Sequence, residues 1–245
     1  GVVIAPTGAG KSMALVHLGT QGLINGKTVV HFTLELGDTV VASRYDSCMT
    51  GIHLKDLYHR KDDIYDEVKE VKGNVIVKEY PTKSASVTTL RNHLSKLQNR
   101  GVEVGMIIVD YADLLKPTGN YKEKRIELES IYENLRGLSQ EFQCPIWTAS
   151  QTNSEAFNKC FVADFIFTLS RTIEDKNVNA ARMFVAKNRN GPDGLVYPMR
   201  MDTSNVLLEV LEPDGNSIQE INKDAAKNQK QRLADIYKKF KKENN

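Results

Sequence analysis

The fold is decided by one short stretch, Ala5-Pro6-Thr7-Gly8-Ala9-Gly10-Lys11-Ser12, which follows an apolar run and opens a segment with helical periodicity. Its glycines let backbone N–H groups close around phosphate oxygens, and the first turn of the following helix adds unpaired N–H donors. Lys11 is expected to reach the β- and γ-phosphates of a nucleotide, and the Ser12 hydroxyl to bind Mg²⁺. The stretch predicts a phosphate-binding loop for ATP with Mg²⁺, made by Pro6, Thr7, Gly8, Ala9, Gly10, Lys11, Ser12 and Met13.

Strands and helices alternate along the chain on both sides of this loop. Several apolar runs are typical of strands that are buried on both faces, as in a parallel sheet covered by helices. The sequence therefore predicts an α/β fold with a mostly parallel central sheet flanked by helices, and a C-terminal β-hairpin around Ser204 and Asn205. The expected strands are 2–4, 28–34, 75–78, 106–110, 145–149, 165–169, 182–187, 197–202 and 206–210. The expected helices are 11–21, 38–50, 54–72, 87–100 and 123–142.

The length of 245 residues, with 40% hydrophobic and 26% charged residues, suits one large domain and a tail. Residues 1–221 are expected to form the domain, and further chain is expected to precede it in the full protein. Residues 222–245 contain eight basic and three acidic residues and predict a basic, peripheral, non-catalytic tail helix. Its predicted apolar stripe is Leu233, Ile236, Tyr237 and Phe240.

Targeting signals and cysteine patterns are absent from the sequence. It contains no apolar run of about 18 residues, so no membrane span is expected, and no signal peptide. Its three cysteines give neither a disulfide framework nor a zinc pattern, and free thiols in a reducing cytoplasm are expected.

Polar side chains stand where three predicted strands end, and the carboxyl ends of parallel strands meet at one edge of a sheet. Asp110 follows an apolar strand, which is typical of the Walker B acid that holds Mg²⁺. Glu35 is suited to polarise an attacking water, although a solvated strand-end glutamate fits the same position. Gln151 follows a third strand, where an amide can sense a γ-phosphate by hydrogen bonding.

Four segments together resemble the C-terminal domain of DnaB-type replicative helicases, a RecA-like P-loop NTPase domain. The phosphate loop has Ala5 where a glycine is usual, as in that family. The resemblance makes Glu35 the catalytic glutamate, Asp110 the Walker B acid and Gln151 the γ-phosphate sensor. Besides the loop, the segments are Phe32-Thr33-Leu34-Glu35, Ile107-Ile108-Val109-Asp110-Tyr111 and Ser150-Gln151-Thr152-Asn153.

The most specific resemblance lies in Ala186-Lys187-Asn188-Arg189-Asn190-Gly191-Pro192-Asp193-Gly194. The family carries a Lys-x-Arg-x-Gly-Pro segment there. The resemblance implies that Arg189 is an arginine finger on ATP held by the neighbouring subunit, with Lys187 beside it. A basic hairpin turn is the plain alternative.

The resemblance implies a hexameric motor that hydrolyses ATP at subunit interfaces, translocates on single-stranded DNA and unwinds duplex. Lys11, Glu35, Gln151 and Arg189 would be its catalytic residues, and primase or other replisome proteins its candidate partners. The expected location is the cytoplasm of a bacterium or a phage-infected host, and the compact, Lys- and Asn-rich sequence favours a phage source. Four basic residues are candidates for DNA contacts or for a solvated helix start: Lys116, Lys122, Lys124 and Arg125.

The chain departs from the family pattern after Asn153. The family usually has a longer, DNA-contacting loop there, whereas only residues 154–163 separate the sensor segment from the next predicted strand. We therefore assign no DNA contact to this loop.

Two other functions share part of the pattern. A RecA-like strand-exchange recombinase has the same fold, phosphate loop and glutamate, but it would lack the segment around Arg189 and form open filaments. A non-motor ATP-dependent switch protein would bind ATP without unwinding a forked duplex.

Overall fold

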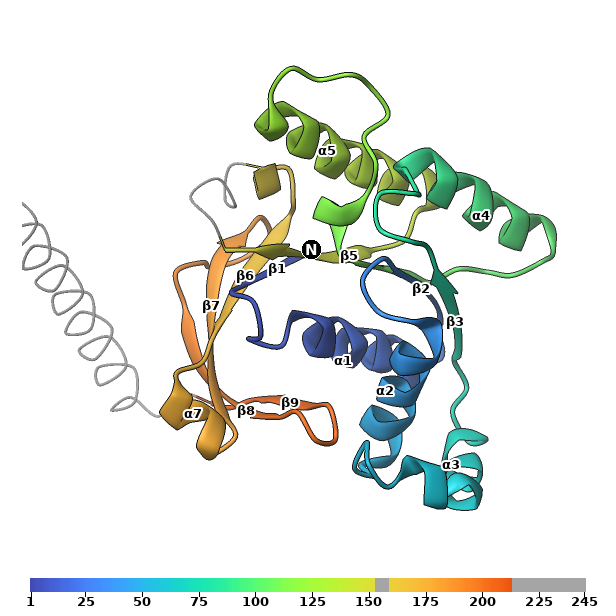
Figure 1. Cartoon of the computed structure of the whole chain (residues 1–245), viewed down its shortest axis with the longest axis vertical. Helices are drawn as coiled ribbons and strands as arrows, with labels where there is room; N and C mark the ends of the chain where they lie inside the picture. Colours follow the sequence, from blue (N-terminus) through green and yellow to red (C-terminus); the bar gives the residue numbers. More distant parts are fainter. Residues whose placement is uncertain (153–158, 213–245) are drawn as a thin grey trace, which may run out of the picture.

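Nine strands in the order β3-β2-β4-β5-β1-β6-β7-β8-β9 form the central sheet of the computed structural model, which describes residues 1–152 and 159–212 (Figure 1). Strands β3 to β6 in this order run parallel, and β7, β8 and β9 continue the sheet antiparallel. This arrangement confirms the predicted α/β fold. The strands are β1 Val2–Ala5, β2 Thr28–Thr33, β3 Asn74–Glu79, β4 Met106–Asp110, β5 Ile146–Gln151, β6 Phe165–Ser170, β7 Ala180–Asn188, β8 Val196–Asp202 and β9 Leu207–Val210.

Helices cover both faces of the parallel strands. In Figure 1, α1 (Lys11–Ile24) and α2 (Asp38–Thr50) lie below the sheet, and α4 (Val87–Asn99) and α5 (Lys124–Phe142) lie above it. Each of the latter pair turns one stripe of buried apolar residues toward the sheet, as a 3.6-residue period requires. These stripes are Leu90, Leu94 and Leu97 on α4, and Leu128, Ile131, Leu135 and Leu138 on α5. The sheet is therefore buried on both faces, which explains its continuous apolar runs.

One predicted helix is wrong. Residues 54–72 form a short 3₁₀ turn, η1 (Leu57–His59), and a separate helix, α3 (Lys61–Val68), with a break at Arg60. The Leu57 side chain is buried, whereas α3 buries none of its side chains. No continuous apolar face therefore holds one long helix together.

A short helix that the sequence analysis did not predict, α7 (Ile173–Asn177), follows β6. It begins with a capping box, in which the Thr172 hydroxyl accepts from Asp175 N–H and the Asp175 side chain accepts from Thr172 N–H. The predicted tail helix, residues 222–245, lies outside the described residues.

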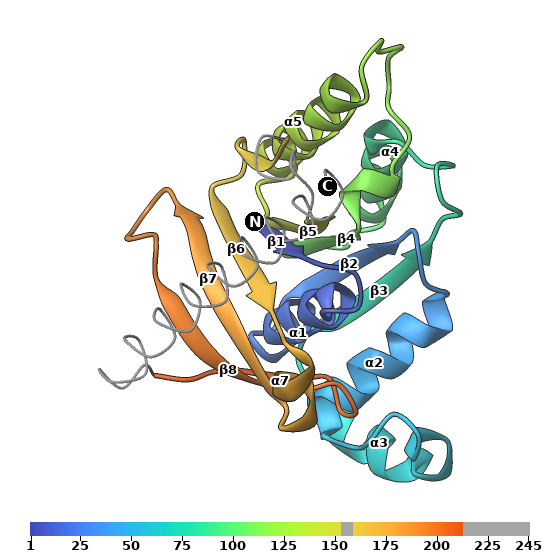
Figure 2. The same cartoon turned by 60° about the vertical axis from the view of Figure 1, so that its left-hand side comes forward.

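The predicted C-terminal hairpin is confirmed by β8 and β9. Figure 2 shows β7 and β8 curving around the side of the sheet that carries α1. There Met201 packs against Gly10, the residue before α1. A Cβ atom on Gly10 would lie 1.9 Å from Met201 Cε, and Gly10 has a φ of 99°. Both facts require glycine at this position.

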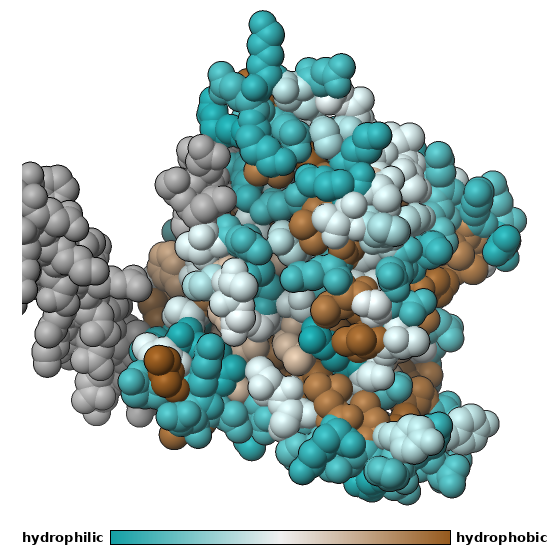
Figure 3. Space-filling view, in the orientation of Figure 1, coloured by the Kyte–Doolittle hydropathy of each residue, from teal (hydrophilic) through white to brown (hydrophobic). Residues whose placement is uncertain are grey.

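The face seen in Figure 3 mixes hydrophilic and apolar areas, and one apolar patch lies over α7, whose Ile173 is exposed. Among the described residues, no helix combines the length and the apolar character that crossing a membrane requires.

Candidate nucleotide-binding site

The carboxyl ends of four parallel strands bring the predicted site residues other than Lys187 and Arg189 to one edge of the sheet. Ala5 at the end of β1 lies opposite Gln151 at the end of β5. Thr33 at the end of β2 lies opposite Asp110 at the end of β4. Since strands β1, β2, β4 and β5 share one direction, the groups that follow them collect at this edge.

The phosphate loop connects β1 to α1 and folds around the amino group of Lys11. This buried group donates hydrogen bonds of 3.0 Å to the carbonyl oxygens of Ala5 and of Pro6. Burial lowers the pKa of Lys11, and the carboxylates of Glu35 and Asp110 oppose that shift. The Lys11 cation therefore lies within electrostatic reach of both acids.

The rest of the loop leaves space for a ligand. Gly8 has a φ of 73°, and a Cβ atom added to it would meet nothing within 4 Å. Pro6 and Thr7 are exposed, whereas Ala9 is buried and donates its N–H to the Pro6 carbonyl at 3.2 Å. Met13 packs against the core beneath α1, which makes its side chain part of the support of the loop.

Asp110 is the acid that fits a divalent cation. Its side chain is 1% exposed, and neither carboxylate oxygen has a hydrogen-bond partner within the described ranges. Burial raises the pKa of Asp110 to about 6, and the nearby Ser12 hydroxyl acts against that shift. A buried, unpaired carboxylate next to a hydroxyl offers oxygen ligands to Mg²⁺.

The same burial predicts that Asp110 lowers the stability of the metal-free protein. Because the pKa is raised from 3.8 to about 6, the folded state loses stability as pH rises through that window. Asp110→Asn should raise the free energy of unfolding by up to about 3 kcal/mol near neutral pH. It should change little below about pH 3, where the acid is protonated in both states. Denaturant unfolding in a chelator at both pH values measures this, and an equal effect at the two values would contradict it.

Glu35 stands at the same edge, two residues beyond β2. The N–H of Leu34 donates to the Asp110 carbonyl at 2.8 Å, which fixes the chain just before Glu35. The Glu35 side chain is exposed, and its charge opposes the lowering of the Lys11 pKa that burial causes. The structure thus places this carboxylate beside the phosphate loop, in contact with solvent.

Arg44 on α2 is a site residue that the sequence analysis missed. Burial lowers the pKa of its guanidinium, and the carboxylates of Asp110 and Glu35 oppose the shift. Arg44 therefore lies within electrostatic range of both acids. No motif marks Arg44, because the fold alone shows which face of α2 turns toward β2 and β4.

Gln151 is the last residue of β5 rather than the residue after it. Its side-chain amide donates to the Tyr111 hydroxyl at 3.0 Å. Since Tyr111 directly follows Asp110, this bond joins the ends of β4 and β5.

Arg189 and Lys187 lie at the opposite edge of the sheet. Strand β7 is antiparallel to β6, and Lys187 pairs with Ile166, which pairs with Val2 of β1. Arg189 lies two residues further from Ala5 in this direction. Five residue steps of about 3.3 Å, or about 16 Å, therefore separate the levels of Arg189 and Ala5 along the strands. The two residues do not approach the phosphate loop of their own chain.

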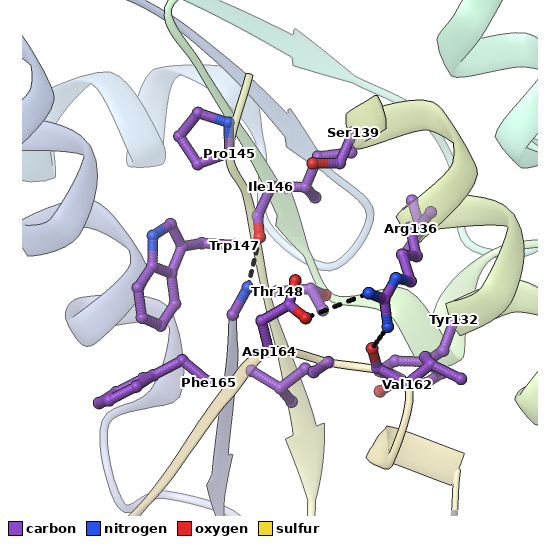
Figure 4. Close-up of a pocket in the computed structure, with 14 residues that line it drawn as sticks. Tyr132, Arg136, Ser139, Pro145, Ile146, Trp147, Thr148, Val162, Asp164 and Phe165 are labelled. Atoms are coloured by element: carbon purple, nitrogen blue, oxygen red, sulfur yellow. Dashed lines mark hydrogen bonds and ion pairs between the residues drawn. The ribbon is translucent and has the colours of Figure 1, made fainter. Parts of the chain in front are cut away.

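An acidic side chain holds Arg189 at this edge. The guanidinium pairs with Asp164 Oδ1 at 2.7 Å, and the Arg189 N–H donates to the Asp164 carbonyl at 2.9 Å. Arg136 shares the same carboxylate at 3.2 Å and lines a pocket of about 240 Å³ (Figure 4). Lys187 donates to the carbonyl of Phe161. None of the phosphate-loop residues lines this pocket.

A phosphate loop at the carboxyl end of the central parallel strand β1, with a buried acid at the end of β4, is the arrangement of a P-loop NTPase. The family model of the DnaB-like helicase C terminal domain matches residues 1–159. The chain belongs to that family, which confirms the predicted family.

Curated relatives agree with this family. The DnaB-like replicative helicase of Enterobacteria phage T4 is 31% identical over 170 residues, which are 64% of this chain and 36% of the relative. The replicative DNA helicase DnaB of Mycoplasma genitalium is 25% identical over 244 residues, with 85% of this chain and 52% of the relative covered. The chain thus spans between about a third and a half of their length.

Solved structures share the fold. One of them, described as an ATPase domain, superposes with a TM-score of 0.72 at 17% identity, covering 86% of this chain and 84% of that one. A DnaB-like replicative helicase, whose structure was described with its interactions with primase, gives a TM-score of 0.73 at 16% identity. It covers 86% of this chain and 57% of that one.

Proposed function

We propose that this chain is the ATP-hydrolysing motor of a hexameric replicative helicase that translocates on single-stranded DNA and unwinds duplex. The observation that carries the proposal is the separation of two half-sites. Lys11, Asp110, Glu35 and Arg44 collect at one edge of the sheet, and Arg189 lies at the other. A complete site then forms where the Arg189 edge of one subunit meets the phosphate loop of the next.

The residues of the loop edge have distinct roles in this proposal. Lys11 leaves the loop carbonyls for the β- and γ-phosphates of ATP, and Glu35 orients the attacking water. Arg44 adds positive charge within electrostatic range of Glu35 and Asp110. Ser12 and Asp110 would hold Mg²⁺, and the ion would supply positive charge beside the phosphates.

Arg189 and Gln151 connect hydrolysis with movement. Arg189 from the neighbour stabilises charge on the transferred phosphoryl group, with Lys187 beside it. The Gln151 amide exchanges its bond to Tyr111 for the γ-phosphate and passes the loss of that phosphate to the chain beyond β5.

The proposed function also implies nucleic-acid and protein partners. Single-stranded DNA would be held mainly by its phosphates, and the basic run Lys116, Lys122, Lys124 and Arg125 is a candidate contact. Of these, Lys124 and Arg125 pair with Glu127 and Glu129 in the free chain. Primase and other replisome proteins are proposed partners of the full-length protein, in the cytoplasm.

The test combines two activity assays and electron-microscope images of the full-length protein. ATP hydrolysis should increase on addition of single-stranded DNA, and a forked duplex should be unwound only with hydrolysable ATP and Mg²⁺. Negative-stain images with ATP should show closed rings. Open filaments would instead indicate a recombinase, and ATP binding without unwinding would indicate a switch protein.

A further inference from the structure

A buried ion pair outside the nucleotide-binding motifs joins Lys159 to Asp113. The Lys159 amino group donates to Asp113 Oδ2 at 2.6 Å, and its side chain is 1% exposed. The Tyr132 hydroxyl donates to Asp113 Oδ1 at 2.9 Å, and the Ser150 hydroxyl to Oδ2 at 3.4 Å. One carboxylate on the turn η2 (Ala112–Leu114) therefore accepts from α5, from β5 and from the chain that leads to β6.

The same turn is also held through its backbone. The Lys83 amino group donates to the carbonyls of Asp113 and Leu115 at 2.9 and 2.8 Å. The Thr148 hydroxyl of β5 accepts from the Ala112 N–H at 2.9 Å and donates to the Val109 carbonyl at 2.8 Å. The ends of β4 and β5 are thus fixed to each other directly behind the nucleotide edge.

Stability alone is a weak reason for burying two charges here. The desolvation of a buried lysine and carboxylate offsets most of their attraction, and apolar pairs of similar volume are often as stable. The position of the pair is more informative. Asp113 lies three residues after Asp110, and Ser150, which Asp113 binds, directly precedes Gln151.

We propose that Asp113 and Lys159 are positioning residues that set the place of the Gln151 amide relative to Asp110 during ATP hydrolysis. This inference rests on the proposed function. The Gln151 amide is held by Tyr111, directly after β4, and, through Ser150, by the Asp113 carboxylate. Removing the Lys159 charge releases that carboxylate, so that the ends of β4 and β5 shift relative to each other. The Gln151 amide is then misplaced relative to the γ-phosphate.

Lys159→Met keeps the length of the side chain and removes its charge. In the full-length ring, kcat should fall about 10-fold, which is less than the ~10²-fold that a misplacement of 1 Å can cause. The Kd for ATP should stay within about 2-fold, because Lys11 and the phosphate loop are untouched. Lys69→Met is the matched control, since it removes an exposed ion pair to Asp66 of 2.7 Å on the far side of the chain. It should leave kcat unchanged.

A double-mutant cycle with Gln151→Ala separates positioning from general support of the fold. If Lys159 acts through Gln151, adding Lys159→Met to Gln151→Ala should lower kcat by less than about 2-fold. The full loss in both backgrounds would overturn the inference.

A second variant covers the case in which Lys159→Met alone does not fold, because it leaves the partly buried Asp113 carboxylate without its cation. Lys159→Met with Asp113→Asn removes both charges and should fold, yet it should show the same loss of kcat. A native melting temperature with wild-type kcat would contradict the proposal. A wild-type ring that hydrolyses no ATP would refute the proposed function, and this inference with it. An active wild type with unaffected variants refutes the inference alone.

Discussion

Arg189→Ala should lower kcat for ATP hydrolysis by about 10³-fold or more in assembled rings, since a finger supplied from a neighbour is worth ~10³–10⁵ in related systems. ATP binding and assembly should remain, because Arg189 lies at the edge opposite the phosphate loop and its exposed pair with Asp164 contributes little stability. Nucleotide affinity, sedimentation and steady-state hydrolysis measure the three properties.

Mixing two kinds of mutant subunit tests whether Arg189 acts on ATP held by a neighbouring subunit. Rings formed from Arg189→Ala and Lys11→Ala subunits contain interfaces that pair an intact phosphate loop with an intact finger, and neither parent ring contains one. Part of the activity should therefore return on mixing. No recovery, with mixed assembly confirmed by differently tagged subunits, would place Arg189 outside the active site. Arg136→Ala is a suitable control, since Arg136 shares the Asp164 carboxylate but belongs to no predicted motif.

Lys11→Ala and Glu35→Gln should both abolish most turnover, but for different reasons. Lys11→Ala removes the only phosphate-loop side chain that carries a positive charge, so hydrolysis and nucleotide affinity should fall together. Glu35→Gln keeps the volume of the side chain and removes its charge. ATP should still bind to it, while kcat falls by about 10²–10⁴-fold, as the loss of a general base implies.

Equilibrium titration with a fluorescent ATP analogue, compared with steady-state rates, distinguishes the two variants. A parallel loss of affinity in both would mean that Glu35 supports the structure of the loop rather than the reaction. Glu127→Gln provides a control at a partly exposed glutamate that pairs with Lys124.

The site edge was predictable because its chemistry is local in sequence. The phosphate loop, Asp110 and Glu35 each follow an apolar run, and such runs become buried parallel strands whose carboxyl ends share an edge. The strand order was not predictable, since no local signal says that β1 lies between β5 and β6. That order is what places Ala5 opposite Gln151.

Residues outside motifs were missed for a related reason. Arg44 lies on a correctly predicted helix, but the sequence does not show which of its side chains reaches the edge. Lys159 and Asp113 are 46 residues apart, and each reads as an ordinary surface charge. The prediction of one helix over residues 54–72 failed for a different reason. Of its apolar residues only Leu57 is buried, and Leu54 and Val71 pack against the core while partly exposed.

Because Arg189 and the phosphate loop lie at opposite edges of the sheet, every subunit has two unlike faces. The number of complete ATP sites then depends on how the subunits assemble. Contacts between unlike faces are head-to-tail, and they form an open row or close into a ring. A row of n subunits then contains n − 1 complete ATP sites, with one finger and one loop unused, whereas a ring contains n. Under the proposed arrangement, activity per subunit rises with the length of the row and reaches its maximum on closure. A subunit that lacks either Arg189 or a working phosphate loop inactivates one ATP site of the ring. A subunit that lacks both inactivates two sites.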